Sequence, residues 1–485
     1  MKIALLFVIS CLFLSASYAQ SPKFKDKYLN SVTASSLKEH VYILASDSLK
    51  GRETGTDGEH KAAKYIQTHF EEYGLKPYND TTFLQAIGLW SWRWGQFNFS
   101  SQQIQLNNYG NMVYLSSAPL DPINDVDCIF IGNGSDSIVS KLKLEGKVAF
   151  ALVNNLKSWY KIANRTRQNG AVAIVMVHKT DPDAFDQLSE QMKNKHQQLS
   201  IGRKKPIFSK TIIKAFAADQ SVAEELFQLS IDSLQHLNAK QIKRLTTAQL
   251  SLACPLIIEK ANANNVAAYL PGKGKTKDAV VISAHYDHIG EGYNGINVGA
   301  DDNSSGTAAV MELAKALSPL KGKLDKNIIF LCTTGEEKGL LGAFYFADHP
   351  QEHGYDIKAN INIDMIGRID STHKSNYIYT IGNNHYPEFD SLLHVANNML
   401  EPLSIQYDYN QSHGFGNFLR LSDHYAFHRR GIPVMGFFSG LHADYHKPSD
   451  TPDKIDYAEM EKRVKLIFTT AYLAAQKTAF TSQTD

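Results

Sequence analysis

The chain has almost no excess of charge of either sign, with 50 Lys and Arg against 49 Asp and Glu and a formal net charge of +1. This balance lacks the basic excess with which proteins hold nucleic acid or anionic membrane surfaces. Long apolar runs are also missing after the N-terminal stretch, because no later segment offers the ~20 uninterrupted apolar residues of a membrane-spanning helix. The sequence therefore predicts no nucleic-acid partner and no integral membrane span.

Cysteine is scarce, with four in 485 residues. Beyond the N-terminal stretch there remain Cys128, Cys254 and Cys332, whose wide spacing excludes a disulfide framework and a CxxC metal site. Two catalytic signatures are absent as well, H-E-x-x-H and G-x-S-x-G, which excludes the enzyme classes that depend on them. Cys332 follows an apolar run and is expected to be a small buried hydrophobic side chain.

The first residues have the pattern of a secretory signal. Lys2 is followed by the apolar stretch Ile3 to Leu14 and by the small-x-small sequence Ser17-Tyr18-Ala19. We expect residues 1–19 to be a signal peptide and the mature protein to be exported, to the periplasm or the extracellular space. A lipoprotein signal at Cys11 is the alternative, although the apolar run before it would be short.

At 485 residues the chain is too long for one compact core, so two domains are expected. We assign residues 20–110 to the N-terminal part of the main domain, 111–255 to an insert and 256–485 to the rest of the main domain. The insert has short β-like runs and a helical stretch, and no His, Asp or Glu cluster with the spacing of metal ligands. The chemistry is therefore expected outside it.

Apolar runs and helical patterns alternate regularly from Asn264 onward. Strands that are apolar throughout and are separated by helices predict an α/β fold, a doubly wound, mostly parallel sheet flanked by helices. The predicted strands are 279–284, 327–332, 361–363, 377–381 and 433–438, and the predicted helices are 307–317, 342–348, 387–400 and 457–475.

Polar clusters of one kind follow four of these strands. In sheets of this type ligands bind beyond the carboxyl ends of the strands, so these side chains should gather at one edge. One His at a strand end is commonly structural, but several His and carboxylate groups together favour zinc, which takes nitrogen and oxygen ligands. Two ions ~3.5–4 Å apart can share a carboxylate and a water. The clusters are 285–288 with 301–303, 336–337, 364, and 442, 444 and 446.

Five segments in this region resemble the M28 zinc metallopeptidases, in the same order, over roughly Asn264 to Ala475. The resemblance implies a zinc exopeptidase-like fold, two Zn²⁺ ions and peptide substrates. It further implies an aminopeptidase that removes N-terminal residues by means of a hydroxide bridging the zinc ions. The segments are Ser283–His288, Gly299–Gly306, Gly335–Glu337, Asn362–Met365 and Tyr445–Asp450.

The resemblance also implies the ligands, one motif position at a time. His285 and Asp364 would hold one zinc, and Glu337 and His446 would hold the other. Asp301 would bridge the two ions, and its bond to the following residue is often cis in this family. In the insert, the motifs at 146–148 and 170–172 resemble the protease-associated domain, with an unrelated small α/β domain as the alternative.

Three further residues are implied to act in catalysis. Glu336 matches the general base that takes a proton from the attacking water and passes it to the leaving amine. Asp287 matches the carboxylate that orients the first histidine ligand. Tyr445 would support the oxyanion, with a merely packed aromatic ring as the alternative. The stretch Ser422-Asp423-His424 resembles one that lines the site, or is structural.

Three alternatives stay open. A carboxypeptidase or dipeptidase would keep the same metals, but it would need Arg or Lys to capture an α-carboxylate. Arg368 is the one arginine in the metal-site segments, which favours an aminopeptidase. A single-zinc glutaminyl cyclase disagrees with the complete Asp301-Asp302 and Glu336-Glu337 pairs, and a metal-free, receptor-like binding protein disagrees with candidates at all five ligand positions.

Overall fold

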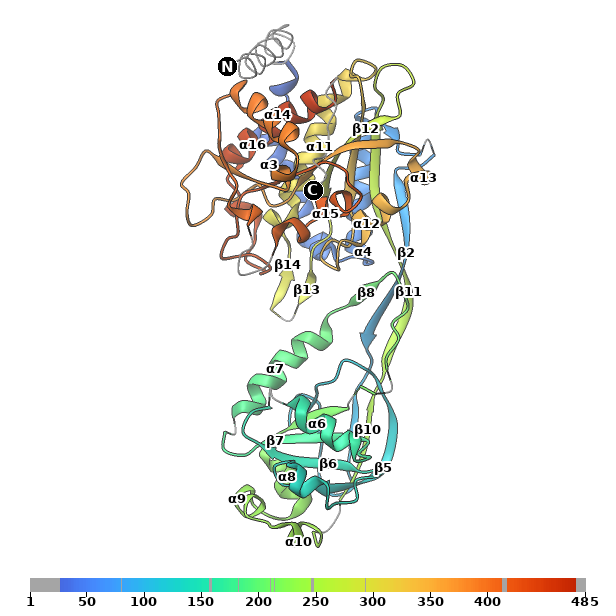
Figure 1. Ribbon diagram of the computed structural model, residues 1–485, viewed down its shortest axis with the longest axis vertical. Helices are drawn as coiled ribbons and strands as arrows, with labels where there is room; N and C mark the ends of the chain where they lie inside the picture. The colour runs from blue at the N-terminus through green and yellow to red at the C-terminus, as the bar shows by residue number, and fades with distance from the viewer. Residues whose placement is uncertain are drawn as a thin grey trace, which may run out of the picture. The chain divides into compact units, whose positions relative to one another are not determined.

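The computed structural model describes residues 27–476, apart from positions 80, 157–158, 182, 210, 213, 246–247, 293 and 412–416. The predicted signal peptide lies outside the described residues. The chain divides into two compact units, one formed by residues up to 88 and from 261 onward and the other by residues 89–260, which contain the predicted insert. Strands β2 (Leu84–Trp94) and β11 (Leu256–Leu270) carry the chain from one unit to the other (Figure 1).

The first unit is built on a sheet with the strand order β18-β17-β19-β16-β12-β15-β11-β2. Strand β12 runs parallel to β15 and β16, and β16 runs parallel to β19, whereas the outer pairs β11–β15 and β17–β19 are antiparallel. Nearly every residue of β12 and β15 is buried, as expected for strands covered on both faces. The bounds are β12 Asp278–His285, β15 Asn327–Thr333, β16 Asp356–Ile363, β17 Tyr377–Ile381, β18 Ser404–Gln406 and β19 Val434–Phe438.

Helices pack on this sheet in two groups. Helix α11 packs on β12, β15 and β16 and contacts α3, α4 and α16, while α15 packs on β16 and β19 and contacts α12. Helix α16 begins where the Asp456 side chain accepts the N–H of Glu459, an N-cap. The bounds are α3 Ala34–Leu44, α4 Asp57–Glu72, α11 Gly306–Leu317, α12 Leu341–Asp348, α14 Pro387–Asn398, α15 His424–His428 and α16 Tyr457–Ala474.

The predicted α/β fold is confirmed, and every strand and helix predicted from Asn264 onward is present. The largest difference is at β16, which begins at Asp356 rather than Ile361. Its first three residues are exposed or half-buried and include Asp356 and Lys358, so the apolar pattern shows only the buried half of the strand.

The second unit has its own sheet, in the order β3-β10-β5-β6-β7-β9-β4, and its own core. Strands β6 and β7 are wholly or almost wholly buried and parallel, and helices α6 and α8 contact β7. The bounds are β3 Asn98–Ser100, β4 Met112–Tyr114, β5 Leu120–Phe130, β6 Val148–Val153, α6 Trp159–Gln168, β7 Ala173–His178, α7 Asp183–Gln197, β9 Ala215–Ala218, α8 Gln220–Phe227 and β10 Gln249–Cys254.

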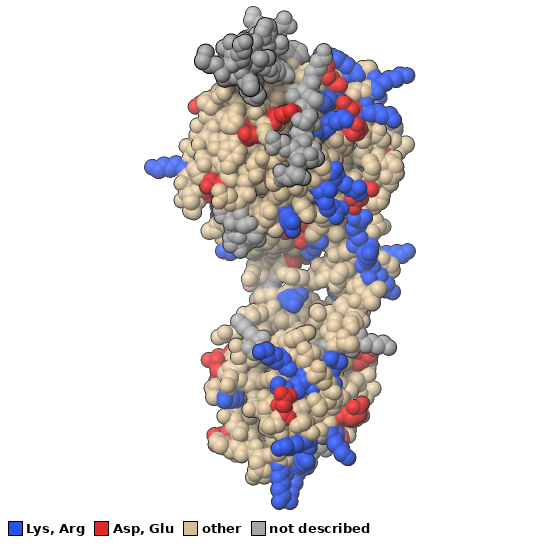
Figure 2. Space-filling model, in the orientation of Figure 1, with Lys and Arg blue, Asp and Glu red and all other residues tan. Residues whose placement is uncertain are grey.

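Several sequence features can be followed on the structure. Cys128, Cys254 and Cys332 are buried free thiols, as predicted for Cys332. None of the helices in the described part of the chain combines the length and the apolar character needed to cross a membrane. Figure 2 shows basic and acidic side chains scattered over a face that is mostly neither, in keeping with the balanced composition.

Candidate metal centre

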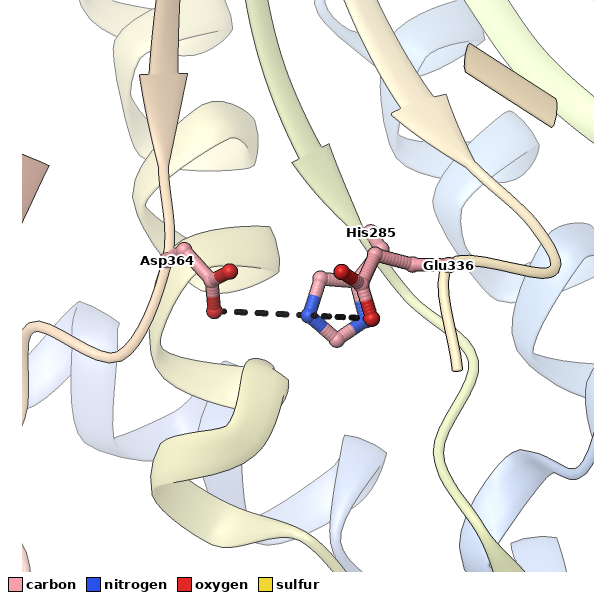
Figure 3. A group of neighbouring side chains, drawn as sticks. All are labelled: His285, Glu336 and Asp364. Carbon is pink, nitrogen blue, oxygen red and sulfur yellow. Dashed lines mark hydrogen bonds and ion pairs between the residues drawn. The ribbon is translucent and has the colours of Figure 1, made fainter. Parts of the chain in front are cut away.

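Three strand ends bring the first group of ligand candidates together. The register pairs His285 with Thr333 of β15, and Ser283 with Asn362 of β16, so Glu336 and Asp364 leave the sheet beside His285. The Nε2 atom of His285 lies 3.3 Å from Asp364 Oδ1 and 4.0 Å from Glu336 Oε2 (Figure 3). The predicted neighbours are thus assembled by parallel strand pairing.

A second group lies next to the first and includes Glu337 and His446. Glu337 Oε2 is 3.2 Å from His446 Nε2, and Glu337 Oε1 is 2.8 Å from His288 Nδ1. Asp302 belongs to both groups, because its Oδ1 is 3.4 Å from His285 Nε2 and its Oδ2 is 3.1 Å from His446 Nε2. One carboxylate therefore faces both groups of ligand candidates.

Asp301 does not face them, so in this geometry the predicted bridging position is wrong by one residue. Asp301 Oδ1 accepts the N–H of Gly367 at 2.6 Å, and its Oδ2 lies 3.3 Å from His442 Nε2. The cis peptide bond likewise joins Asp302 to Asn303, not Asp301 to Asp302. Two adjacent aspartates of the same motif cannot be distinguished by residue type, and the backbone path decides which of them turns inward.

Asp287 is fully buried and linked to two other residues of the site. Its Oδ1 accepts the main-chain N–H of Glu336 at 3.1 Å, and its main-chain carbonyl lies 3.0 Å from His285 Nδ1. A carbonyl only accepts, so Nδ1 carries a proton, and Nε2 is the ring nitrogen that faces Asp302 and Asp364. The predicted orientation of His285 by Asp287 is made by the main chain, with the carboxylate 3.7 Å away.

Several carboxylates are buried close together in the site, and this burial and mutual repulsion shift their pKa values. Burial raises the pKa of Glu336 well above its ordinary value, and Glu337, Asp364 and Asp423 raise it further against the opposing effect of His285. Burial also opposes ionisation of Glu337, but hydrogen bonds from His288 and His446 hold its pKa well below the usual range. A cation would relieve this crowding of negative charge.

Tyr445 stacks on the ring of His446, with 3.9 Å between the ring centroids. It also lines a cavity of about 80 Å³ that begins at Asp364 and is mostly apolar. The other walls include Met365, Ile381, Phe418, Leu421, Phe438 and Leu441. The position thus serves packing, and it also makes the tyrosine part of the wall of a mostly apolar cavity.

Several neighbouring residues hold this edge in place. Ser422 Oγ donates to Asp364 Oδ2 at 2.6 Å, which explains the match of its stretch to the lining of the site. Arg368 is not free, since its Nη2 lies 2.9 Å from Asp444 Oδ2 and its Nη1 3.6 Å from Asp450 Oδ1. Asp450 Oδ2 in turn accepts the N–H groups of Asp301 and Asp302, at 2.9 and 3.2 Å.

The sequence reasoning missed three residues that the structure brings to the site. His288 lies in a motif already singled out and could have been found there. Asp450 also ends a motif already singled out, but no residue pattern marks its action through main-chain N–H groups. Thr54 could not have been found, because it lies far away in the chain.

Comparison with known proteins supports the reading of the motifs. Residues 265–471 match the family described as peptidase family M28. Aminopeptidase YwaD of Bacillus subtilis is 27% identical over 237 residues, which are 47% of this chain and 48% of that protein. The probable leucine aminopeptidase of Arthroderma otae is 31% identical over 218 residues, 43% of this chain and 57% of that protein. The chain thus spans about half the length of these curated relatives.

Solved structures share the fold over most of the chain. An aminopeptidase from Aneurinibacillus has a TM-score of 0.54 at 19% identity and covers 95% of this chain and 98% of its own. A zinc aminopeptidase from Bacillus subtilis has a TM-score of 0.55 at 19% identity, covering 92% and 96%. At such identity the likeness shows the fold, while the family match spans both groups of ligand candidates. The match assigns residues 265–471 to peptidase family M28.

Proposed function

We propose that this protein is a zinc aminopeptidase that removes residues from the N-termini of peptides. The observation that carries the proposal is the Asp302 carboxylate, which has one oxygen toward His285 and the other toward His446. A shared carboxylate between two groups of nitrogen and oxygen ligands is the arrangement that a pair of zinc ions needs.

The residues fit two zinc ions by the chemistry of their donor atoms. His285 and Asp364 would hold one ion and Glu337 and His446 the other, with Asp302 in place of Asp301 as the shared ligand. Since the Asp287 carbonyl accepts from Nδ1 of His285, Nε2 is the nitrogen that would bind an ion placed between the ring and the carboxylates. When bound, the two ions lower the pKa of water and polarise the substrate carbonyl.

The chain's own residues would move and place the proton. Glu336 accepts it from the attacking water and passes it to the leaving amine, a task suited to a carboxyl whose pKa is raised by burial. Asp287 holds the Glu336 main chain through the N–H group and holds the ring of His285 through its carbonyl. Tyr445, stacked on His446, is the candidate donor to the oxyanion.

The pairing of Arg368 favours an aminopeptidase over a carboxypeptidase. Capture of a free α-carboxylate needs an unpaired Arg or Lys, but Arg368 is paired with Asp444 and lies close to Asp450. The buried carboxylates that crowd the site suit an α-ammonium group instead. The apolar cavity beside Asp364 would receive the first side chain of the peptide, with a preference for residues such as leucine.

Two parts of the proposal concern the rest of the chain. Residues 1–19 would direct export, which N-terminal sequencing of the protein secreted by its native host can test. Residues 111–255 would form a protease-associated domain, a proposal that rests on two short motifs and on the parallel strands β6 and β7 in the second unit.

The first test compares a leucine anilide with its N-acetylated counterpart, each with and without a chelator. We expect cleavage of the free-amine substrate alone, and its loss when the chelator removes the metal. If metal-loaded protein cuts neither substrate, the aminopeptidase proposal fails. Blocked peptides with free C-termini then test the carboxypeptidase alternative.

The adjacent glutamates offer a matched pair of variants. Glu336→Gln or Glu336→Ala should lower kcat by about 10²–10⁴-fold and leave two zinc ions per chain, because the lost group carries a proton and does not hold metal. Glu337→Gln should lose zinc as measured by atomic absorption. Near-normal activity of the Glu336 variants would show that another group is the base.

A further inference from the structure

The segment from Arg52 to Thr54 lies far from the metal-site motifs in sequence, but its side chains form hydrogen bonds with residues in or next to them. Arg52 is fully buried and donates to the carbonyls of Tyr286 and Val298 at 2.7 Å and of Gly299 at 3.1 Å. These carbonyls belong to the loops that carry His285 and Asp302. Arg52 therefore links the loop that follows His285 to the loop that precedes Asp302.

Thr54 continues this contact to a site residue. Its side chain is buried, and its Oγ1 donates to Asp287 Oδ2 at 2.9 Å. The other oxygen of Asp287 accepts the N–H of Glu336. With one donor on each oxygen, the orientation of the Asp287 carboxylate is set, and the carboxylate connects Thr54 to the backbone of Glu336.

We propose that Thr54 is a positioning residue for the metal-ligand candidates. It acts through Asp287, which contacts both His285 and the backbone N–H of Glu336. This inference rests on the proposed zinc aminopeptidase, and it gives a role in its metal site to a residue outside the matched range 265–471. Residues that orient metal ligands from behind commonly change metal affinity or activity 10–100-fold when altered.

The chemistry of the pair explains why a hydroxyl is needed. Asp287 is fully buried, so an oxygen that loses its donor finds no water to replace it. Removing the hydroxyl frees the carboxylate to rotate and releases its hold on the Glu336 N–H.

The experiment compares Thr54→Val, which keeps the shape and removes the hydroxyl, with Thr54→Ser, which keeps the hydroxyl. Release of zinc from the loaded protein to a chromogenic chelator is followed in parallel with kcat and KM for a leucine anilide. We expect Thr54→Val to release zinc about 10-fold faster and to lose about 10-fold in kcat with little change in KM. Thr54→Ser should stay within about twofold of the wild type.

Thr166→Val is the matched control, because Thr166 is a buried threonine of the second unit whose hydroxyl donates to Ala163 at 2.9 Å. It should lower thermal stability without changing zinc release. If Thr54→Val behaves like this control, Thr54 is merely structural and the inference is overturned while the proposed function stands. A wild type that neither binds zinc nor cleaves the anilide would overturn both.

Discussion

Asp301 and Asp302 are adjacent and chemically identical, yet their surroundings give them different roles. Asp302 faces ring nitrogens of both ligand groups. Asp301 faces the main chain of Gly367 and the ring of His442, which ties the loop after β16 to the loop that carries His446. A side chain's role here follows from which way the backbone turns it and not from its type.

We therefore expect the two Asp→Asn variants to differ. Asp302→Asn should lose bound zinc and at least 10²-fold in activity, because an amide is a poor shared ligand. Asp301→Asn should keep its zinc and most of its activity, because its amide oxygen can still accept from Gly367. Zinc content by atomic absorption and kcat on a leucine anilide measure both. The reverse result would restore Asp301 as the bridge.

Residue type and order suffice to predict most of this site, because ligands at strand ends must converge when the strands are parallel neighbours. His285, Glu336, Glu337, Asp364 and His446 all lie where that reasoning places them. What escapes it are contacts made by the backbone or by distant segments. Asp450 supports the aspartate pair by accepting two main-chain N–H groups, a property that its sequence neighbourhood does not reveal.

At the scale of elements, the short turn Asp47–Arg52 contacts two loops of the site, the loop after β12 and the loop before α11. Lys50, Gly51 and Arg52 have positive φ angles of 48°, 69° and 54°, which bring the chain close against the loop of Asn297. A Cβ on Gly51 would lie 2.1 Å from the Asn297 carbonyl oxygen, so the close approach requires glycine. Arg52 then reaches the carbonyls of both loops from this turn.

Arg52→Lys should lower the free energy of unfolding by about 2–4 kcal/mol, since a lysine cannot span the carbonyls that the guanidinium joins and would leave some of them buried without a donor. Urea unfolding measures the change as a lower midpoint with an unchanged slope. Arg429→Lys is the control, because Arg429 is 47% exposed and pairs with Asp348 at the surface. Equal losses in the two variants would contradict the role given to Arg52.

The short helix α13 (Pro350–His353) ends in a histidine whose protonation opposes folding. His353 is buried, stacks on Phe346 at 4.7 Å and accepts the N–H of Tyr355 through Nδ1. Burial lowers its pKa to about 4 from 6.5 in the unfolded chain. As the pH falls below 6.5, His353 becomes protonated in the unfolded chain but stays neutral in the folded chain. The free energy of unfolding therefore decreases as the pH falls toward 4.

His353→Asn keeps an acceptor near the Tyr355 N–H and removes the titration. Between pH 7 and pH 5 the wild type should lose about 2 kcal/mol more than the variant, as the difference between two urea unfolding series. At pH 8 the difference should no longer change with pH. Parallel curves for wild type and variant over the whole range would show that His353 is not held neutral by the fold.

At the scale of the whole molecule, the alternation of strands and helices predicts the main fold, whereas the limits of the second unit depend on tertiary contacts. The unit spans 89–260, wider than the predicted insert at both ends, because the long strands β2 and β11 continue from one unit into the other. The change in sequence pattern at residue 111 lies close to the start of β4, but it does not mark β3, nor the point at which a continuous strand passes from one core to the other.

The division into two units gives metal removal a distinctive thermal signature. The first unit buries the carboxylates of Asp287, Asp301, Asp302 and Asp423 at or next to the ligand candidates, and bound cations would relieve their repulsion. A ligand at about 1,000 times its Kd stabilises the folded state by about 4 kcal/mol. A chelator should therefore lower the calorimetric transition of the first unit by about 10 °C and leave that of the second unit in place.

The variants assign the transitions, since Arg52→Lys should shift only the first unit's peak and Thr166→Val only that of the second. If both peaks moved together on chelation, the units would unfold as one and metal binding would stabilise the whole chain. If neither moved, zinc would contribute nothing to stability, and the crowded carboxylates would have to be neutralised by protons instead. Zinc added back to the chelated protein should restore the first peak, because the ligands themselves are unchanged.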